Sequence, residues 1–164
     1  MNETTPAAGQ EKAALRRELE ATHTAYREVV GAIAAARWNA RSGNPGWTCG
    51  QLAWHLASGV KFSTGLIENA RKGKGTNPPS FLLPLGYKAN EFLVRRNSRK
   101  ATRDSVLADY ATALAQLLRL LDGVQDHEFA LSATNFGQTK TIREMFHLSA
   151  EHFEEHGPEI KAAL

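Results

Sequence analysis

The 164-residue sequence contains a single cysteine, Cys49. One cysteine excludes an internal disulfide, and it also excludes a zinc site built from several thiolates. The sequence has no apolar run approaching the roughly 18 residues of a membrane-spanning helix, and its N-terminus lacks the apolar core of a signal peptide. From these absences we expect a cytoplasmic protein with no membrane segment.

Internal repeats, low-complexity segments and convincing strand alternation are absent as well. Hydrophobic residues make up 42% of the chain and charged residues 23%, which is typical of a globular protein. The length suits one domain with a sizeable core. We therefore expect a disordered tail over residues 1–8 and a single helical domain over residues 9–164.

The basic residues are concentrated in one segment, although the net charge of the whole chain is only +3. Residues 71–103 contain nine lysines and arginines and one acidic residue, Glu91, so this basic run has a net charge of +8. Such a run usually forms a solvated helix face, but it can also attract a small acid, a phosphate or a nucleic acid. Nucleic-acid binding is the weakest interpretation, because no recognition motif or aromatic interleaving accompanies the charge.

Five segments carry helical patterns of apolar residues, separated by turn signals. They cover residues 10–37, 48–71, 85–97, 102–123 and 141 to the C-terminus. Between them, residues 76–84 are expected to form a loop, and residues 127–137 an irregular or weakly extended segment. The pattern predicts an all-α protein, a four-helix bundle with one extra short helix.

Two of the helix starts carry capping boxes, in which a threonine and a residue three positions later satisfy each other's backbone amides. Thr48 pairs in this way with Gln51, and Thr141 with Glu144. Cys49 lies in the first turn of the second helix, where the helix dipole could lower its pKa. We favour the simpler interpretation, in which this small residue fills space beside a tryptophan.

Two histidines four residues apart, His152 and His156, lie in the last helical segment. At about 100° per residue both fall in the apolar arc around Ile142, whereas the charged residues fall on the opposite side. Both imidazoles therefore point toward the core from one helix face, as two ligands of a divalent metal would. His147 falls about 140° from the centre of that arc and is predicted to be a surface residue.

A third histidine, His55, shares the apolar face of the second segment with Leu52 and Leu56. A single inward histidine is usually satisfied by a carbonyl or hydroxyl group. Three in one small bundle favour a shared divalent metal, and nitrogen ligands without a thiolate suit Zn²⁺, Ni²⁺ or Fe²⁺. Such a site can keep a position open for water or substrate. Phe153 follows His152, so the pattern is not the His-Glu-x-x-His of zinc proteases.

Two motifs far apart in the sequence carry a resemblance to a known family. They are Pro45-Gly46-Trp47-Thr48 with Gln51-Leu52-Ala53-Trp54-His55-Leu56, and Thr141-Ile142-Arg143-Glu144 with His152-Phe153-Glu154-Glu155-His156. Together they resemble the opening of the second helix and the last helix of DinB/YfiT-like proteins. The resemblance spans nearly the whole chain in the order of its elements.

The resemblance implies both a fold and a site. The family's fold is a four-helix bundle with an up-down-down-up path, and many members look dimeric, so the resemblance implies a homodimer. Its metal triad falls on His55, His152 and His156, the residues that helical phase also selects. Characterised members are metal-dependent and use a low-molecular-weight thiol, such as bacillithiol or mycothiol, in transferase or isomerase reactions.

We therefore expect a divalent-metal-dependent enzyme, a thiol S-transferase or isomerase acting on a small-molecule electrophile. Arg95 and Arg96 are the predicted cofactor-binding residues, which would dock the carboxylate or phosphate of an anionic thiol. Residues 73–86 and the basic run match no particular subfamily, so thiol and electrophile stay unassigned. The alternative is a non-catalytic stress-response or binding module with a structural or vestigial metal.

Overall fold

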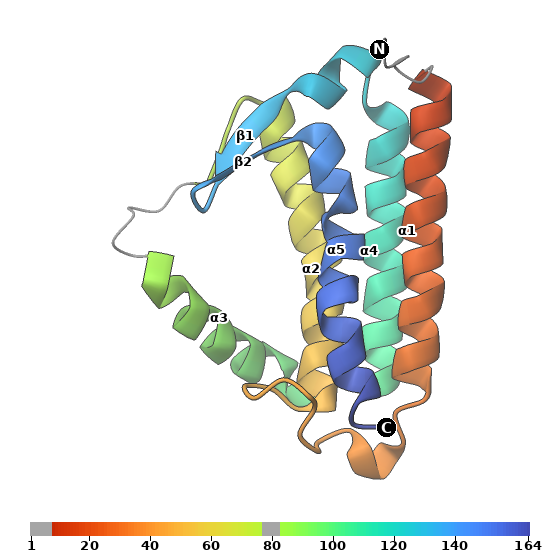
Figure 1. Ribbon diagram of the computed structural model, residues 1–164, viewed down its shortest axis with the longest axis vertical. Helices are drawn as coiled ribbons and strands as arrows, with labels where there is room; N and C mark the ends of the chain where they lie inside the picture. The colour runs from red at the N-terminus through yellow and green to blue at the C-terminus, as the bar shows by residue number, and fades with distance from the viewer. Residues whose placement is uncertain (1–7, 77–82) are drawn as a thin grey trace, which may run out of the picture.

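The structure is a computed structural model that describes residues 8–76 and 83–164 (Figure 1). Its helices are α1 (Ala8–Gly31), α2 (Cys49–Arg71), α3 (Leu83–Asn97), α4 (Arg103–Gly123) and α5 (Ile142–Lys161), with the short 3-10 helices η1 (Ala35–Arg37), η3 (Ser98–Lys100) and η4 (Asp126–Ala130). The strands β1 (Ser132–Asn135) and β2 (Gln138–Thr141) form an antiparallel hairpin before α5. None of the described helices is long and apolar enough to cross a membrane.

Four helices, α1, α2, α4 and α5, lie side by side as a bundle, and α3 stands away from it (Figure 1). Both α1 and α2 pack against α4 and α5. The helices α1 and α5 run in one direction along the bundle and α2 and α4 in the other, so the path is up-down-down-up. Since α2 and α4 are parallel, α3 carries the chain back along the bundle between them. The expected four-helix bundle with one extra short helix is confirmed.

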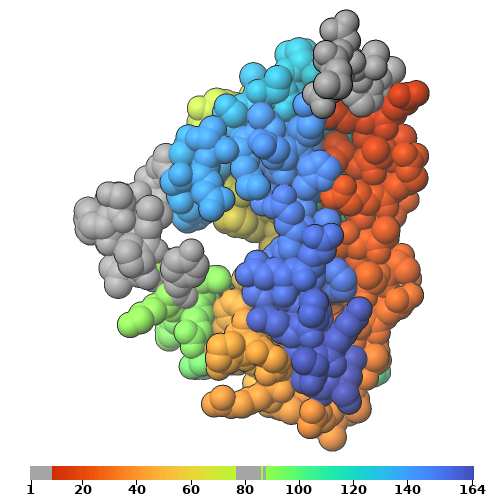
Figure 2. All heavy atoms as spheres, viewed as in Figure 1, coloured from red at the N-terminus to blue at the C-terminus, as the bar shows by residue number. Residues whose placement is uncertain are grey.

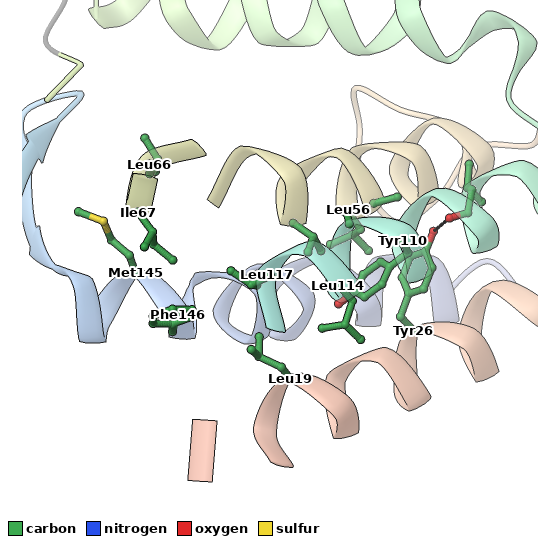
Figure 3. Close-up of a cluster of buried hydrophobic side chains, with 14 of the residues drawn as sticks. Leu19, Tyr26, Leu56, Leu66, Ile67, Tyr110, Leu114, Leu117, Met145 and Phe146 are labelled. Carbon is green, nitrogen blue, oxygen red and sulfur yellow. Dashed lines mark hydrogen bonds between the residues drawn. The ribbon is translucent and has the colours of Figure 1, made fainter. Parts of the chain in front are cut away.

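The core lies where the apolar faces of the four bundle helices meet (Figure 3). One fully buried side chain from each helix illustrates this: Leu19 of α1, Ile67 of α2, Leu117 of α4 and Phe146 of α5. A buried hydrogen bond also joins two helices, because the Tyr26 hydroxyl donates to the carbonyl of Ala53 at 3.0 Å. This packing fixes α2 and α5 against each other, and these two helices carry the three candidate histidines.

Both predicted capping boxes are present. The Thr48 hydroxyl accepts from the Gln51 amide at 3.3 Å, and the Gln51 side chain accepts from the Thr48 amide at 3.0 Å. Thr141 and Glu144 make the same reciprocal pair at the start of α5. Because each box fixes the residue at which its helix begins, local sequence helps to set where the inward histidines fall on α2 and α5.

The first helix ends earlier than the sequence pattern predicts. α1 stops at Gly31, and an extended residue, Ala34, precedes η1 within the stretch expected to be helical. Ile33 is buried in the core at this turn, so tertiary packing overrides the helix propensity of the alanine-rich sequence. The turn places Trp38 against the bundle, where its indole N–H donates to the carbonyl of Ala101 at 3.1 Å.

The β1–β2 hairpin corrects the expectation of a chain without strands. Ser132 pairs with Thr141 and Asn135 with Gln138. The two turn residues both have positive φ, 52° at Phe136 and 80° at Gly137, as a tight hairpin turn requires. The strands are only four residues long and mostly polar, so no apolar alternation marks them in the sequence.

The predicted N-terminal tail and the predicted loop lie partly outside the described residues. The parts outside are residues 1–7 of the tail and residues 77–82 of the loop. The described part of the chain starts at Ala8, which is already helical, and resumes at Leu83, where α3 begins two residues before the predicted helix. The remaining predicted helix, at 102–123, agrees with α4 and its cap at Thr102.

Candidate metal centre

Three histidines meet between α2 and α5. His55 comes from α2, and His152 and His156 come from successive turns of α5. Each offers one ring nitrogen, and these three nitrogens lie within 4.8 Å of one another. The shortest approach is 2.8 Å between Nε2 of His55 and Nε2 of His152. Helical phase therefore brings together the residues that the sequence selects.

His147 lies apart from this cluster, on another side of α5. Its Nδ1 hydrogen-bonds to the carboxylate of Glu18 on α1, at 2.8 and 2.9 Å to the two oxygens. The side chain is 37% exposed, so the surface position predicted for it is confirmed. Although His147 is close to His152 in sequence, its side chain contacts α1 and does not join the cluster.

The cluster favours neutral imidazoles. Burial, with the other two histidines adding to it, lowers the pKa of His55 to about 3. Burial and the neighbouring His156 lower the pKa of His152 to about 4. A neutral imidazole keeps one lone pair, so neither ring must lose a net proton to ligate a cation near pH 7. The ring that donates in the Nε2–Nε2 contact must move its proton to Nδ1.

The geometry also fits a small divalent cation. Zinc–nitrogen bonds of about 2.0–2.1 Å in a tetrahedral site place two ligand nitrogens about 3.3 Å apart. The nitrogens of His55 and His152 are 2.8 Å apart, so a rotation that separates them by about 0.5 Å would suffice. All three histidines are partly buried.

A glycine makes room for the second ligand. Gly59 lies one turn after His55 on α2, and a β-carbon built on it would lie 2.6 Å from Nδ1 of His152. No real β-carbon approaches a ring atom so closely, so any side chain at this position would displace the imidazole. The sequence places Gly59 on the same helix face as His55, but its role depends on the approach of α5 and is visible only in the fold.

Two polar residues that the sequence analysis did not single out hold the third ligand. The carboxylate of Glu159 lies 2.6 Å from Nδ1 of His156, and the side-chain amide of Asn44 donates to both oxygens of that carboxylate, at 3.1 and 3.2 Å. Glu159 follows His156 by three residues, a helical spacing that could have suggested the pair. Asn44 lies in the turn before α2, more than a hundred residues away in sequence, and no local pattern indicates this contact.

The same turn covers one side of the cluster with an aromatic ring. The Trp47 ring lies 4.5 Å from that of His55 and 6.0 Å from that of His156, measured between centroids. Its indole Nε1 is buried without a hydrogen-bond partner among the described residues. Cys49, two residues later, is fully buried, and burial raises the pKa of its thiol. These observations support the favoured interpretation, in which Cys49 fills space, over a thiol activated by the helix dipole.

The basic run does not form one continuous patch. Arg71, at the end of α2, is paired with Glu128 at 2.8 Å. Arg95 and Arg96 lie near the end of α3, at the opposite end of the molecule (Figure 1). Arg95 pairs with Glu91 at 2.6 Å and donates to the carbonyl of Gly46 at 2.9 Å, next to Trp47. Arg96 is exposed. Arg95 of the predicted docking pair therefore contacts the turn that borders the histidines, and its guanidinium is already engaged.

A hollow opens between α3, the hairpin and the bundle (Figure 2). Two exposed aromatic side chains belong to the elements around it: Phe62 of α2 is 53% exposed and Phe136 of the hairpin turn is 47% exposed. Their rings are 6.0 Å apart between centroids. Phe62 follows His55 by seven residues, two helical turns along the same face. This face of α2 therefore continues from the histidines to an apolar pair.

An up-down-down-up bundle with three inward histidines on its second and last long helices is a helical bundle with a candidate metal centre. The chain belongs to the DinB superfamily, whose family model matches residues 18–160. No protein with a curated description matches the sequence.

Two solved structures have the same fold. YfiT from Bacillus subtilis, described as a probable metal-dependent hydrolase with an unusual four-helix bundle topology, matches with a TM-score of 0.77 and 17% identity over 99% of this chain and 90% of that one. A mycothiol-dependent maleylpyruvate isomerase matches with a TM-score of 0.74 and 15% identity over 92% of this chain. The chain spans 61% of the isomerase. At these identities the likeness shows the fold alone.

Proposed function

We propose that His55, His152 and His156 bind one divalent cation and that the protein is a metal-dependent enzyme. The observation that carries the proposal is the convergence of three ring nitrogens within 4.8 Å of one another. The lowered pKa values of His55 and His152 support it, because both rings are neutral and able to ligate near pH 7. Zn²⁺, Ni²⁺ and Fe²⁺ are the candidates that suit an all-nitrogen set.

When bound, a divalent cation with three protein ligands lowers the pKa of a thiol or water molecule at its remaining position. The protein residues supply the rest. His55 and His152 supply neutral imidazoles, Gly59 leaves space for the His152 ring, and Trp47 covers the His55 ring. The contacts of Gly59 and Trp47 restrict the two rings, which reduces the reorganisation that binding requires.

We further propose that the substrate pair is an anionic low-molecular-weight thiol and a small electrophile, in an S-transferase or isomerase reaction. In the transfer reaction the thiol loses its proton and its sulfur forms a bond to the electrophilic carbon. The bond from that carbon to its leaving group breaks, and the leaving group departs with the electron pair and takes up the proton. Arg96, exposed one residue after Arg95, is the side chain proposed to meet the carboxylate or phosphate of the thiol. The choice of a thiol is supported by the mycothiol-dependent isomerase that has the same fold. Because the other structure is described as a probable hydrolase, water is the rival nucleophile to test.

The first experiment measures metal in the purified protein and in three single variants, His55→Ala, His152→Ala and His156→Ala. Wild type is expected to carry about one equivalent of metal, and each variant is expected to lose it. His127→Ala is the matched control, since His127 is an exposed histidine on η4. Full occupancy in all three variants would contradict the assignment of these ligands.

The second experiment screens the metal-loaded protein with thiols and electrophiles, with and without a chelator. Turnover that needs both thiol and metal supports the transferase or isomerase. Turnover with water alone identifies a hydrolase and contradicts the thiol proposal. Stoichiometric metal without turnover in either assay favours the alternative, a binding module whose metal is structural.

A further inference from the structure

The geometry points to a positioning role for Glu159 and Asn44: together they fix the tautomer of His156 that carries its proton on Nδ1. The tautomer itself does not depend on the proposed function. Only its use, which is to leave one nitrogen free for a metal, rests on that proposal. With Nδ1 committed to Glu159, Nε2 of His156 is the nitrogen left unprotonated for a cation.

The proton assignment follows from the hydrogen-bonding capacities of the groups. An ionised carboxylate can only accept, so in the 2.6 Å contact between His156 and Glu159 the proton must lie on Nδ1 of the ring. Neutral imidazole carries one proton, so Nε2 then keeps its lone pair. The bond joins two partly buried groups, with 12% of the His156 side chain and 28% of the Glu159 side chain exposed.

Asn44 keeps Glu159 in the accepting role. The carbonyl oxygen of the Asn44 side chain accepts from the Gly46 amide at 2.9 Å, which determines which end of the side chain faces Glu159. Its NH₂ group therefore donates to the carboxylate, at 3.1 and 3.2 Å. The hydrogen bonds from Asn44 therefore hold the Glu159 carboxylate in the orientation in which it accepts from His156.

The backbone holds the same two segments together. The amide of Gly43 donates to the carbonyl of Glu159 at 2.7 Å, and a β-carbon on Gly43 would lie 3.1 Å from the Glu159 α-carbon. The turn before α2 is thus seated on the last turns of α5. Gly46, in the same turn, also accepts from Arg95 of α3 at 2.9 Å. Contacts therefore run from α3 through this turn to the ring of His156.

A carboxylate that accepts from a metal-binding histidine orients the ring and raises its basicity, and its removal typically costs about 10–100-fold in metal affinity. Neither His55 nor His152 has a carboxylate partner among the described residues, and these two rings contact each other through Nε2. The device is therefore specific to His156. We therefore expect the affinity for the metal to depend on Glu159, although Glu159 is not itself a proposed ligand.

The test uses Glu159→Gln, which keeps the size of the side chain, with Glu155→Gln as the matched control. Glu155 is exposed on α5 next to His156 and loses the same charge on substitution. The first readout is ¹⁵N NMR of the histidine rings in the metal-free full-length protein. Wild type and Glu155→Gln should show His156 protonated on Nδ1. Glu159→Gln should show a substantial Nε2–H population, since the glutamine NH₂ can donate to Nδ1.

The second readout is the Kd for Zn²⁺. We expect a rise of about 10–100-fold in Glu159→Gln, a smaller rise in Asn44→Ala and less than about a twofold change in Glu155→Gln. Unchanged tautomer and unchanged Kd in Glu159→Gln would overturn the inference. If wild type binds no Zn²⁺, Ni²⁺ or Fe²⁺, the proposed function fails, and the NMR result still decides whether Glu159 fixes the tautomer.

Discussion

Gly59 of α2 and His152 of α5 are in such close contact that a β-carbon on the glycine would lie 2.6 Å from Nδ1 of the imidazole. The ring of His152 can therefore occupy its place on α5 only because residue 59 of α2 has no side chain. Gly65 lies six residues further along α2, and a β-carbon there would meet nothing within 4 Å. The two glycines therefore form a matched pair in one helix.

Gly59→Ala should displace His152 and weaken divalent-metal binding by about tenfold or more, as loss of ligand positioning does. Gly65→Ala should leave metal affinity unchanged and stabilise the protein by up to about 1 kcal/mol, through helix propensity alone. Calorimetric titration with Zn²⁺ and urea unfolding of both variants check the pair. Equal metal affinity in the two variants would show that the ring of His152 does not need this space.

Acid should destabilise the metal-free protein through the histidine cluster. The pKa values of His55 and His152 are lowered to about 3 and about 4, so in the unfolded chain both rings take up a proton near pH 6.5 while in the folded chain they stay neutral. The unfolded state then binds more protons, and stability must fall as pH drops from about 6.5 toward 4. Above about pH 6.5 both rings are neutral in the folded and the unfolded chain, so they add no further pH dependence to the stability.

The effect is bounded by about 1.4 kcal/mol per pH unit for each histidine, and partial exposure will reduce it. Urea unfolding between pH 4 and pH 7, in the presence of chelator, measures the slope. The double variant His55→Ala with His152→Ala should have a shallower slope than wild type, whereas His127→Ala should match wild type. A wild-type slope equal to that of the double variant would contradict the burial of these rings.

The histidine cluster could be predicted from the sequence because helical phase is a local property. His55, His152 and His156 fall on apolar arcs and His147 does not, and both capping boxes fix where their helices begin. Once α2 and α5 are known to be neighbours, the convergence of their inward side chains follows. The bundle itself is predictable for the same reason, since apolar periodicity marks each long helix.

The rest could not be predicted, because it depends on how distant segments approach each other. Asn44 reaches Glu159 only because the turn before α2 is seated on the end of α5. The hairpin strands are too short and polar to leave an apolar pattern. The basic run divides between two ends of the molecule because α2 ends at one end of the bundle and α3 ends at the other (Figure 1).

Cys49 should be unreactive in the folded protein. Its side chain is fully buried and burial raises the pKa of the thiol, so little thiolate is present and reagents have no access to it. We expect modification by a disulfide reagent at pH 8 to be about a hundredfold or more slower in native protein than in urea. A spectrophotometric thiol assay measures both rates. Rapid modification of native protein would restore the activated-thiol interpretation.

Metal binding should link α2 to α5 and raise the melting temperature. At a free metal concentration of about 100 times Kd, linkage contributes about 2.7 kcal/mol. For a chain of 164 residues this corresponds to an increase of about 5–10 °C. His156→Ala should abolish most of the increase, while His147→Ala should retain it, because His147 binds Glu18 on another face of α5. Differential scanning fluorimetry with Zn²⁺ and Ni²⁺ measures both. An increase that survives in His156→Ala but disappears in His147→Ala would place the metal on α1 and α5 instead of between α2 and α5.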